Sequence, residues 1–238
     1  MQNINNLKIK IFSDGADKSD MIKMNEQTFI QGLTTNPTLM KKAGIKNYAE
    51  FCKDIVKYVK TKPISFEVFS DDFLEMERQA KEISTWGDNV YVKIPITNTK
   101  NQSSCDLVRN LSNLGIKVNI TAIMSIDQVK DILKVLNPEI PSYISIFAGR
   151  IADTGRDPLP LMVEALNLMQ FNPKSELIWA SPRELLNIFQ AEHIGCHVIT
   201  VTKDILNKLK LVGYDLNKYS LDTVKMFYND SVEAGFKL

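Results

Sequence analysis

The chain has 238 residues, of which 44% are hydrophobic and 24% are charged, and its formal net charge is +1. This balance is typical of an ordinary globular protein, and the near-neutral charge disfavours binding to nucleic acid. Three cysteines exclude a disulfide framework, and no apolar run approaches the roughly 18 residues of a membrane span. The start, MQNINNLKIKIF, has no long apolar stretch, so we expect no signal peptide and a reduced, cytoplasmic setting.

Short apolar, β-branched runs alternate along the chain with amphipathic stretches. Eight runs are strand candidates, at Lys8–Asp14, Phe29–Leu33, Ile64–Phe69, Val90–Pro95, Lys117–Ile123, Tyr143–Ala148, Glu176–Ser181 and His197–Thr202. Alternation of strands and helices predicts a parallel sheet, and eight is the number of strands in a closed (β/α)8 barrel. An open, doubly wound sheet is the alternative architecture. We favour the barrel because of this number and because of the side-chain pattern described below.

The intervening stretches predict helices at Asn47–Lys60, Asp71–Trp86, Ser125–Leu136 and Asp157–Phe171. The paired aspartates and Ser125 suit helix N-termini, and the prolines at 158 and 160 fall in a first turn, where proline is tolerated. One more helix is expected from about Tyr219 onward. We therefore predict that residues 1–238 form one α/β domain, a (β/α)8 TIM barrel, with a C-terminal helical segment at about 215–238.

Side chains alternate between the two faces of each predicted strand. The more apolar set is expected to pack against the outer helices, and the other set to face the barrel axis. In the seventh run this places Ile178 and Ala180 outward and Trp179 inward. The inward set includes polar residues toward the carboxyl ends of the strands, which carry the active site in enzymes of this fold: Asp14, Glu67, Lys93, Asn119, Thr121, Ser145 and Ser181.

Lys93 is the sharpest single signal, because it interrupts the apolar run Val90–Pro95. Burying an ammonium group is costly unless it is paired or becomes neutral, and burial lowers the pKa of a lysine. A neutral lysine amine is a nucleophile that forms Schiff bases with carbonyl compounds. The alternative is a purely structural salt bridge between Lys93 and Glu67 or Asp14.

Several short motifs at predicted strand ends resemble the transaldolase family, which includes transaldolases and the smaller fructose 6-phosphate aldolases. They are Thr34-Thr35-Asn36-Pro37, Val92-Lys93-Ile94-Pro95, Asn119-Ile120-Thr121-Ala122, Phe147-Ala148-Gly149-Arg150-Ile151 and Ala180-Ser181-Pro182-Arg183. The resemblance is specific because the motifs occur in the family's order, from about Phe12 to about Thr202. It implies a (β/α)8 barrel, class I aldol chemistry on sugar phosphates, and neither a metal nor an organic cofactor.

The resemblance also implies roles for individual residues. Lys93 would form the Schiff base, Asp14 would move the proton of the C4 hydroxyl, and Glu67 with Thr121 would position a water. Donor hydroxyls and the dihydroxyacetone unit would be held by Asn36, Asn119 and Ser145. The phosphate would be bound by Arg150, Ser181 and Arg183, because guanidinium groups bind phosphate with charge-assisted hydrogen bonds.

Two positions bear on the branch of the family. Glu67 and Phe147 match transaldolases, where fructose 6-phosphate aldolases have Gln and Tyr. Gly15 and Glu184 depart from the family's pattern, and Glu184 would weaken phosphate binding if it pointed inward. Two other functions remain open: an aldolase that releases free dihydroxyacetone, and a barrel that binds sugar phosphates without catalysis.

Two further features have more than one interpretation. His193, Cys196 and His197 form a metal-like cluster, but we favour a helix end and loop because no second cluster accompanies them. The C-terminal aromatic residues, Tyr219, Phe227, Tyr228 and Phe236, leave three arrangements open. They would pack on the barrel, cover the site, or join a neighbouring subunit in a homo-oligomer.

Overall fold

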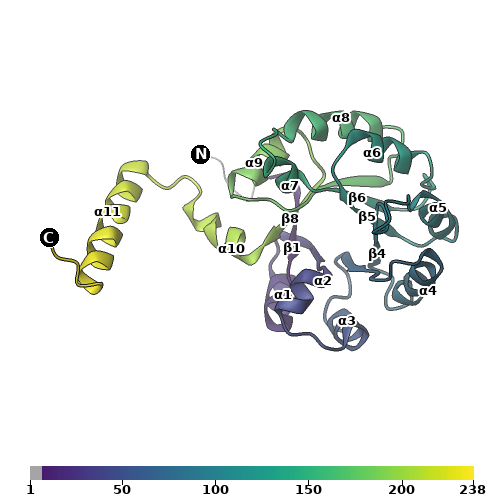
Figure 1. Ribbon diagram of the computed structural model, residues 1–238, viewed down its shortest axis with the longest axis horizontal. Coiled ribbons are helices and arrows are strands. Elements are labelled where there is room, and N and C mark those ends of the chain that lie inside the picture. The colour runs from purple at the N-terminus through teal and green to yellow at the C-terminus, as the bar shows by residue number, and fades with distance from the viewer. Residues whose placement is uncertain (1–6) are drawn as a thin grey trace.

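A computed structural model describes residues 7–238. Residues 1–6, the beginning of the segment in which we expect no signal peptide, lie outside the described residues. Eight parallel strands form a closed barrel in the order β1 to β8 (Figure 1). They are β1 (Lys10–Asp14), β2 (Ile30–Thr34), β3 (Ile64–Glu67), β4 (Val90–Pro95), β5 (Val118–Ile123), β6 (Ser142–Ile146), β7 (Ser175–Trp179) and β8 (Val198–Thr202). The predicted (β/α)8 barrel is confirmed, and the open sheet is excluded.

Helices follow every strand and surround the barrel (Figure 1). They are α1 (Lys18–Glu26), α2 (Pro37–Lys42), α3 (Tyr48–Val56), α4 (Phe73–Ser84), α5 (Cys105–Asn113), α6 (Ile126–Leu133), α7 (Ala148–Ala152), α8 (Leu159–Met169), α9 (Leu186–His193), α10 (Lys203–Leu206), the 3-10 helix η2 (Asn207–Leu211) and α11 (Leu216–Glu233). The predicted roles of the paired aspartates and of Ser125 at helix N-termini are confirmed. Asp72 and Ser125 are N-caps, as is Asn47, and their side chains accept a backbone N–H of the first turn. A capping side chain fixes where a helix starts, so these residues mark the point at which each loop ends and its helix begins.

The barrel has two apolar cores. The larger core lies between the strands and the surrounding helices. The smaller core fills the barrel axis and consists of Phe12, Tyr143, Ile178, Ala180 and Val198, with Tyr91 and Phe147 packed against it. The rings of Tyr91 and Tyr143 lie 4.4 Å apart, and a Cβ on Gly32 would meet the ring of Phe12 at 2.5 Å. Aromatic rings thus occupy much of the axis, and polar side chains gather toward the carboxyl ends of the strands.

The predicted orientation of β7 was wrong. Ile178 and Ala180 face the barrel axis, whereas Trp179 belongs to the core between strands and helices. The alternation of faces is present, but all three residues are apolar, so their pattern does not indicate which face is which. On the axis, Ile178 and Ala180 pack in the same core as Phe12 and Tyr143.

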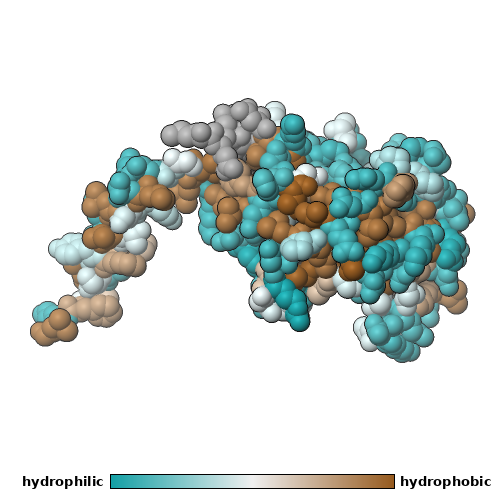
Figure 2. All heavy atoms as spheres, turned by 90° about the horizontal axis from the view of Figure 1, so that it is seen from above, coloured by the Kyte–Doolittle hydropathy of each residue, from teal (hydrophilic) through white to brown (hydrophobic). Residues whose placement is uncertain are grey.

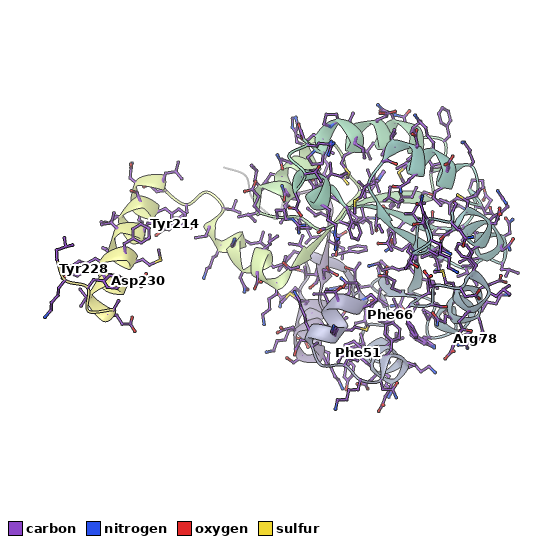
Figure 3. All side chains as sticks on the ribbon, viewed as in Figure 1. Phe51, Phe66, Arg78, Tyr214, Tyr228 and Asp230 are labelled. Carbon is purple, nitrogen blue, oxygen red and sulfur yellow. The ribbon has the colours of Figure 1, made fainter. Side chains whose placement is uncertain are left out.

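The C-terminal helix α11 extends away from the barrel instead of packing on it (Figure 1). None of its residues, 216–233, is buried, and its apolar side chains are visible on the surface in Figure 2. Tyr228 and Asp230 lie on this projecting part of the chain, far from Phe51 on α3 and Phe66 on β3 (Figure 3). Packing of α11 on its own barrel and covering of its own site are therefore not the arrangements found. Among residues 7–238, no helix is both long and apolar enough to cross a membrane.

Candidate active site

Lys93 points into the barrel from β4 and is only 6% exposed. Its Nζ donates to the carbonyl of Thr35 at 3.0 Å and lies 3.4 Å from Oε2 of Glu67. The strand register places Glu67 of β3 on one side of Lys93 and Asn119 of β5 on the other. The ion pair considered from the sequence is therefore present. It places a carboxylate beside the amine, where the carboxylate can transfer a proton or position a water next to a reacting carbonyl.

Asp14 ends β1 on the same side of the barrel. Its Oδ1 accepts a hydrogen bond from Oγ1 of Thr34 at 2.8 Å, and the Thr34 hydroxyl is also bonded to the hydroxyl of Thr200 on β8. Burial raises the pKa of Asp14, although the charge of Lys93 and the hydrogen bond from Thr34 act in the opposite direction. A carboxyl group with a raised pKa is better suited to accept a proton from a hydroxyl group near neutral pH.

Thr34 and Thr200 were missed by the sequence reasoning. Both are β-branched residues in apolar strands, so they read as ordinary strand formers. The signal that would have found them is the alternation in β2 and β8, because Thr34 shares its inward face with Gly32 and Thr200 shares its face with Val198.

Asn119 is fully buried and joins three strands. Its Nδ2 donates to Oγ of Ser65 at 3.0 Å, and its Oδ1 accepts from Oγ of Ser145 at 2.7 Å. Two of the predicted site residues, Asn119 and Ser145, are therefore in direct contact, and Ser65 is an additional member of the group. Such a chain of hydrogen bonds holds each side chain in one orientation, which keeps polar atoms fixed around Lys93.

Thr121 lies two residues beyond Asn119 on β5, and its buried hydroxyl has no hydrogen-bond partner among the residues that the structure describes. The next residue, Ala122, has a φ of 63°, and the pairing of β5 with β6 shifts register between Ile120 and Ile123. A buried hydroxyl without a partner is unfavourable. This side chain is thus available to a water or a ligand inside the barrel.

Asn36 follows β2 and is the N-cap of α2. Its Oδ1 accepts the backbone N–H of Leu39 at 3.0 Å, and Pro37 occupies the first turn. Asparagine at the cap and proline in the first turn both favour a helix start at this point. The same placement puts the Asn36 side chain at the carboxyl end of a barrel strand.

Arg183 and Ser181 meet beyond the end of β7. Nη1 of Arg183 donates to Oγ of Ser181 at 3.1 Å, and Nε donates to Oδ1 of Asp153 at 2.9 Å, while Nη2 contacts the second oxygen of Asp153. Ser181 has a φ of 59°. A Cβ on Gly149 would lie 1.6 Å from the Ser181 carbonyl oxygen, so only glycine allows this close approach of α7 to the chain after β7.

Arg150 lies on α7, where it is exposed, and its guanidinium group lies 5.5 Å from the centre of the Phe147 ring. Glu184 is exposed as well, and it lines a pocket together with Arg183, Trp179 and Asn187. Arg150 and Arg183 come from the ends of neighbouring strands, β6 and β7.

His197 and Cys196 serve the local structure, whereas His193 is exposed at the end of α9. Nδ1 of His197 accepts the backbone N–H of Leu177 at 2.9 Å, and burial raises the pKa of the Cys196 thiol to about 12. Within residues 7–238, no group of three or more His, Cys, Asp or Glu side chains is placed to hold a metal ion.

Relatives of known name match nearly the whole chain. Residues 11–238 match the family model described as Transaldolase/Fructose-6-phosphate aldolase. A probable transaldolase of Nitrosopumilus maritimus is 33% identical over 216 residues, which cover 90% of this chain and 92% of the relative. A probable transaldolase of Thermoanaerobacter sp. is 31% identical over 231 residues, which cover 97% and 100%. One of Clostridium kluyveri is 35% identical over 199 residues, which cover 83% and 88%.

Solved structures resemble the chain in fold alone. A 2,3-dimethylmalate lyase superposes with a TM-score of 0.53 at 10% identity, covering 98% of this chain and 86% of its own. KGPDC from Streptococcus mutans superposes with a TM-score of 0.56 at 10% identity, covering 84% and 90%. The family model and the named relatives go further than the fold, because they match in sequence, and the family model spans the strands that carry Asp14, Glu67 and Lys93. The chain is therefore an enzyme of the transaldolase/fructose-6-phosphate aldolase family.

Proposed function

We propose that this enzyme is a transaldolase, which moves a dihydroxyacetone unit between sugar phosphates through a Schiff base on Lys93. The observation that carries the proposal is the buried Lys93 amine, 3.4 Å from the Glu67 carboxylate and in the same barrel end as Asp14. An amine, a neighbouring carboxylate and a second carboxyl group are the groups that imine formation and aldol cleavage require.

The reaction starts when the Lys93 amine attacks the carbonyl carbon of a ketose phosphate. The resulting carbinolamine loses water to give the iminium ion, a step in which Glu67 and the hydroxyl of Thr121 hold the departing water. Asp14 then accepts the proton of the C4 hydroxyl, the C3–C4 bond breaks, and an aldose phosphate leaves. The electron pair of the broken bond passes into the iminium ion and gives an enamine.

The second half of the reaction reverses these steps with another aldehyde. The enamine attacks the acceptor carbonyl, Asp14 returns its proton to the new hydroxyl, and water hydrolyses the iminium ion to release the product and the free amine. Asn36, Asn119 and Ser145 would hold the hydroxyl groups of the dihydroxyacetone unit, with Phe147 beside them. Arg183, Ser181 and Arg150 would bind the phosphate group, at the far end of the sugar from the reacting carbonyl.

Two residues favour a transaldolase over an aldolase that releases free dihydroxyacetone. Glu67 supplies a carboxylate next to Lys93, which suits repeated formation and hydrolysis of covalent intermediates. Phe147 supplies no hydroxyl to protonate the enamine, so the covalent intermediate waits for an acceptor. A barrel that only binds sugar phosphates would not need the residues to which the reaction assigns a chemical step, which are Lys93, Asp14, Glu67 and Thr121.

The test is turnover of fructose 6-phosphate with and without a four-carbon aldose phosphate. A transaldolase forms sedoheptulose 7-phosphate only when the acceptor is present. Without it, the enzyme releases no more than one equivalent of glyceraldehyde 3-phosphate per chain, because the dihydroxyacetone unit stays bound to Lys93. Steady release of free dihydroxyacetone without an acceptor would instead identify the aldolase. Binding of the sugar phosphate without either product would identify the non-catalytic barrel.

A further inference from the structure

The pairing of β2 with β3 stops just before Glu67. The ladder includes a bond from the Leu33 N–H to the Pro63 carbonyl at 2.9 Å and one from the Thr35 N–H to the Ser65 carbonyl at 3.4 Å. In a parallel ladder of this register, the Glu67 N–H would next bond to the Thr35 carbonyl. The Glu67 carbonyl would bond to the N–H of residue 37.

Neither of these two backbone hydrogen bonds forms. Residue 37 is Pro37, which has no N–H and begins α2. The carbonyl of Thr35 accepts the Nζ of Lys93 at 3.0 Å. The backbone of Glu67 therefore needs partners from elsewhere, because it lies partly buried at the end of a strand.

The hydroxyl group of Tyr48 supplies both partners. It donates to the Glu67 carbonyl at 2.6 Å and accepts the Glu67 N–H at 2.8 Å. Burial raises the pKa of Tyr48, so the hydroxyl keeps the proton that it donates. Tyr48 is the first residue of α3, and its ring packs against Phe69 at 5.1 Å and Trp86 at 6.4 Å. One hydroxyl group thus takes the place of two backbone hydrogen bonds between β2 and β3.

We propose that Tyr48 is a positioning residue for the reaction proposed above, on which this inference rests. By holding the backbone of Glu67, its hydroxyl sets where the Glu67 carboxylate lies relative to the Lys93 amine. By satisfying the Glu67 N–H, it also leaves the Thr35 carbonyl to Lys93. Both neighbours of the reacting nitrogen, Glu67 and Thr35, are then fixed through one tyrosine that does not touch the substrate.

Replacing Tyr48 with phenylalanine removes the hydroxyl and keeps the ring. The Glu67 N–H then turns to water, because Lys93 occupies the Thr35 carbonyl. This change moves Glu67 relative to Lys93, and a displacement of about 1 Å in an active site costs up to roughly 100-fold in rate. We expect the rate constant for borohydride-trapped adduct formation with fructose 6-phosphate to fall about tenfold in Tyr48→Phe. The final stoichiometry of adduct per chain stays that of the unmodified protein.

The matched control is Tyr58→Phe, because Tyr58 lies two residues beyond the end of α3 and is exposed. The adduct of Tyr58→Phe should form with the same rate constant as that of the unmodified protein. A purely structural role for Tyr48 would lower the final stoichiometry, as part of the protein unfolds, and leave the rate constant of the folded fraction unchanged. That result would overturn the proposal.

A double-mutant cycle with Glu67→Gln tests whether Tyr48 acts through Glu67. In that background, Tyr48→Phe should slow trapping by less than about twofold, since residues that act as a unit are not additive. The same loss in both backgrounds would contradict the inference.

Amide hydrogen exchange gives a readout that does not depend on the reaction. The Glu67 amide should exchange at least about tenfold faster in Tyr48→Phe and at the unmodified rate in Tyr58→Phe, because only the first loses the protecting hydroxyl. Unchanged exchange would overturn the positioning claim even if trapping slowed. If the unmodified protein forms no adduct, the proposed function fails and the catalytic part of this inference falls with it, while exchange still decides whether Tyr48 holds Glu67.

Discussion

Asp153 holds Arg183 by both oxygens of its carboxylate, with Nε to Oδ1 at 2.9 Å. The Arg183 hydrogen bond lowers the pKa of Asp153, so the carboxylate stays charged at neutral pH. One edge of the guanidinium group is thereby fixed at the C-cap of α7, and Nη1 donates to the hydroxyl of Ser181. Arg183 is 44% exposed, which leaves it accessible to a phosphate group.

Arg183→Met is therefore expected to raise the KM for fructose 6-phosphate by at least about tenfold, because a hydrogen bond to a charged group contributes about 1.5–3 kcal/mol. Unphosphorylated fructose should react at an unchanged, low rate. Arg109→Met is the control, since Arg109 is 47% exposed and is also paired with an aspartate, Asp106, but lies on α5. Equal losses for the phosphorylated and the free sugar would contradict a phosphate-binding role.

Thr34→Val is expected to shift the acidic limb of the pH–rate profile to higher pH. Asp14 must be ionised to accept a proton, so activity falls as the pH drops through its pKa, which burial has already raised. The Thr34 hydrogen bond lowers that pKa, and its removal raises the pKa further. The measurement is kcat/KM between pH 5 and 9.

The control for this shift is Thr61→Val, because Thr61 is exposed and precedes β3 at the opposite end of the barrel. It should leave the profile unchanged. A Thr34→Val profile that keeps its acidic limb, or moves it to lower pH, would show that Asp14 is not the group that titrates.

The exposed helix α11 leads to a prediction about assembly. Ten of the eighteen large apolar side chains exposed on residues 7–238 belong to the last 23 residues, 216–238. Such a surface is unfavourable in water. Because every copy carries the same helix, a second copy of the chain is the partner that would cover it.

Light scattering should therefore give the full chain a mass of at least twice the 27.0 kDa of one chain. A chain that ends at Gly213 should form a smaller assembly. Monomers for both chains would contradict the expected homo-oligomer. A truncated chain that keeps the assembly of the full chain would show that copies meet through another surface.

The sequence predicts the polar end of the barrel well because charged residues interrupt apolar strands there. Lys93 within Val90–Pro95 and Glu67 at the end of β3 both face the axis, as their alternation with valine, isoleucine and phenylalanine indicates. Ser181 is a partial exception. It lies beyond the end of β7, and its position beside Arg183 depends on a left-handed backbone and on Gly149.

Two contacts between elements distant in the chain could not be predicted. The bond between Tyr48 and the backbone of Glu67 arises because Pro37 lacks an N–H and Lys93 occupies the Thr35 carbonyl. Pro37 and Lys93 are each visible in the sequence. That both lie beside the Glu67 backbone follows only from the way the strands are arranged in the closed barrel. The pair formed by Asp153 and Arg183 is of the same kind.

The central claim is that Lys93 forms a Schiff base with a ketose phosphate. The most direct measurement is borohydride reduction in the presence of fructose 6-phosphate, followed by intact-mass and peptide mass spectrometry. The account predicts a reduced dihydroxyacetone adduct on the peptide that carries Lys93, and none in Lys93→Met. An adduct on a different lysine, or none with either fructose 6-phosphate or sedoheptulose 7-phosphate, would contradict it.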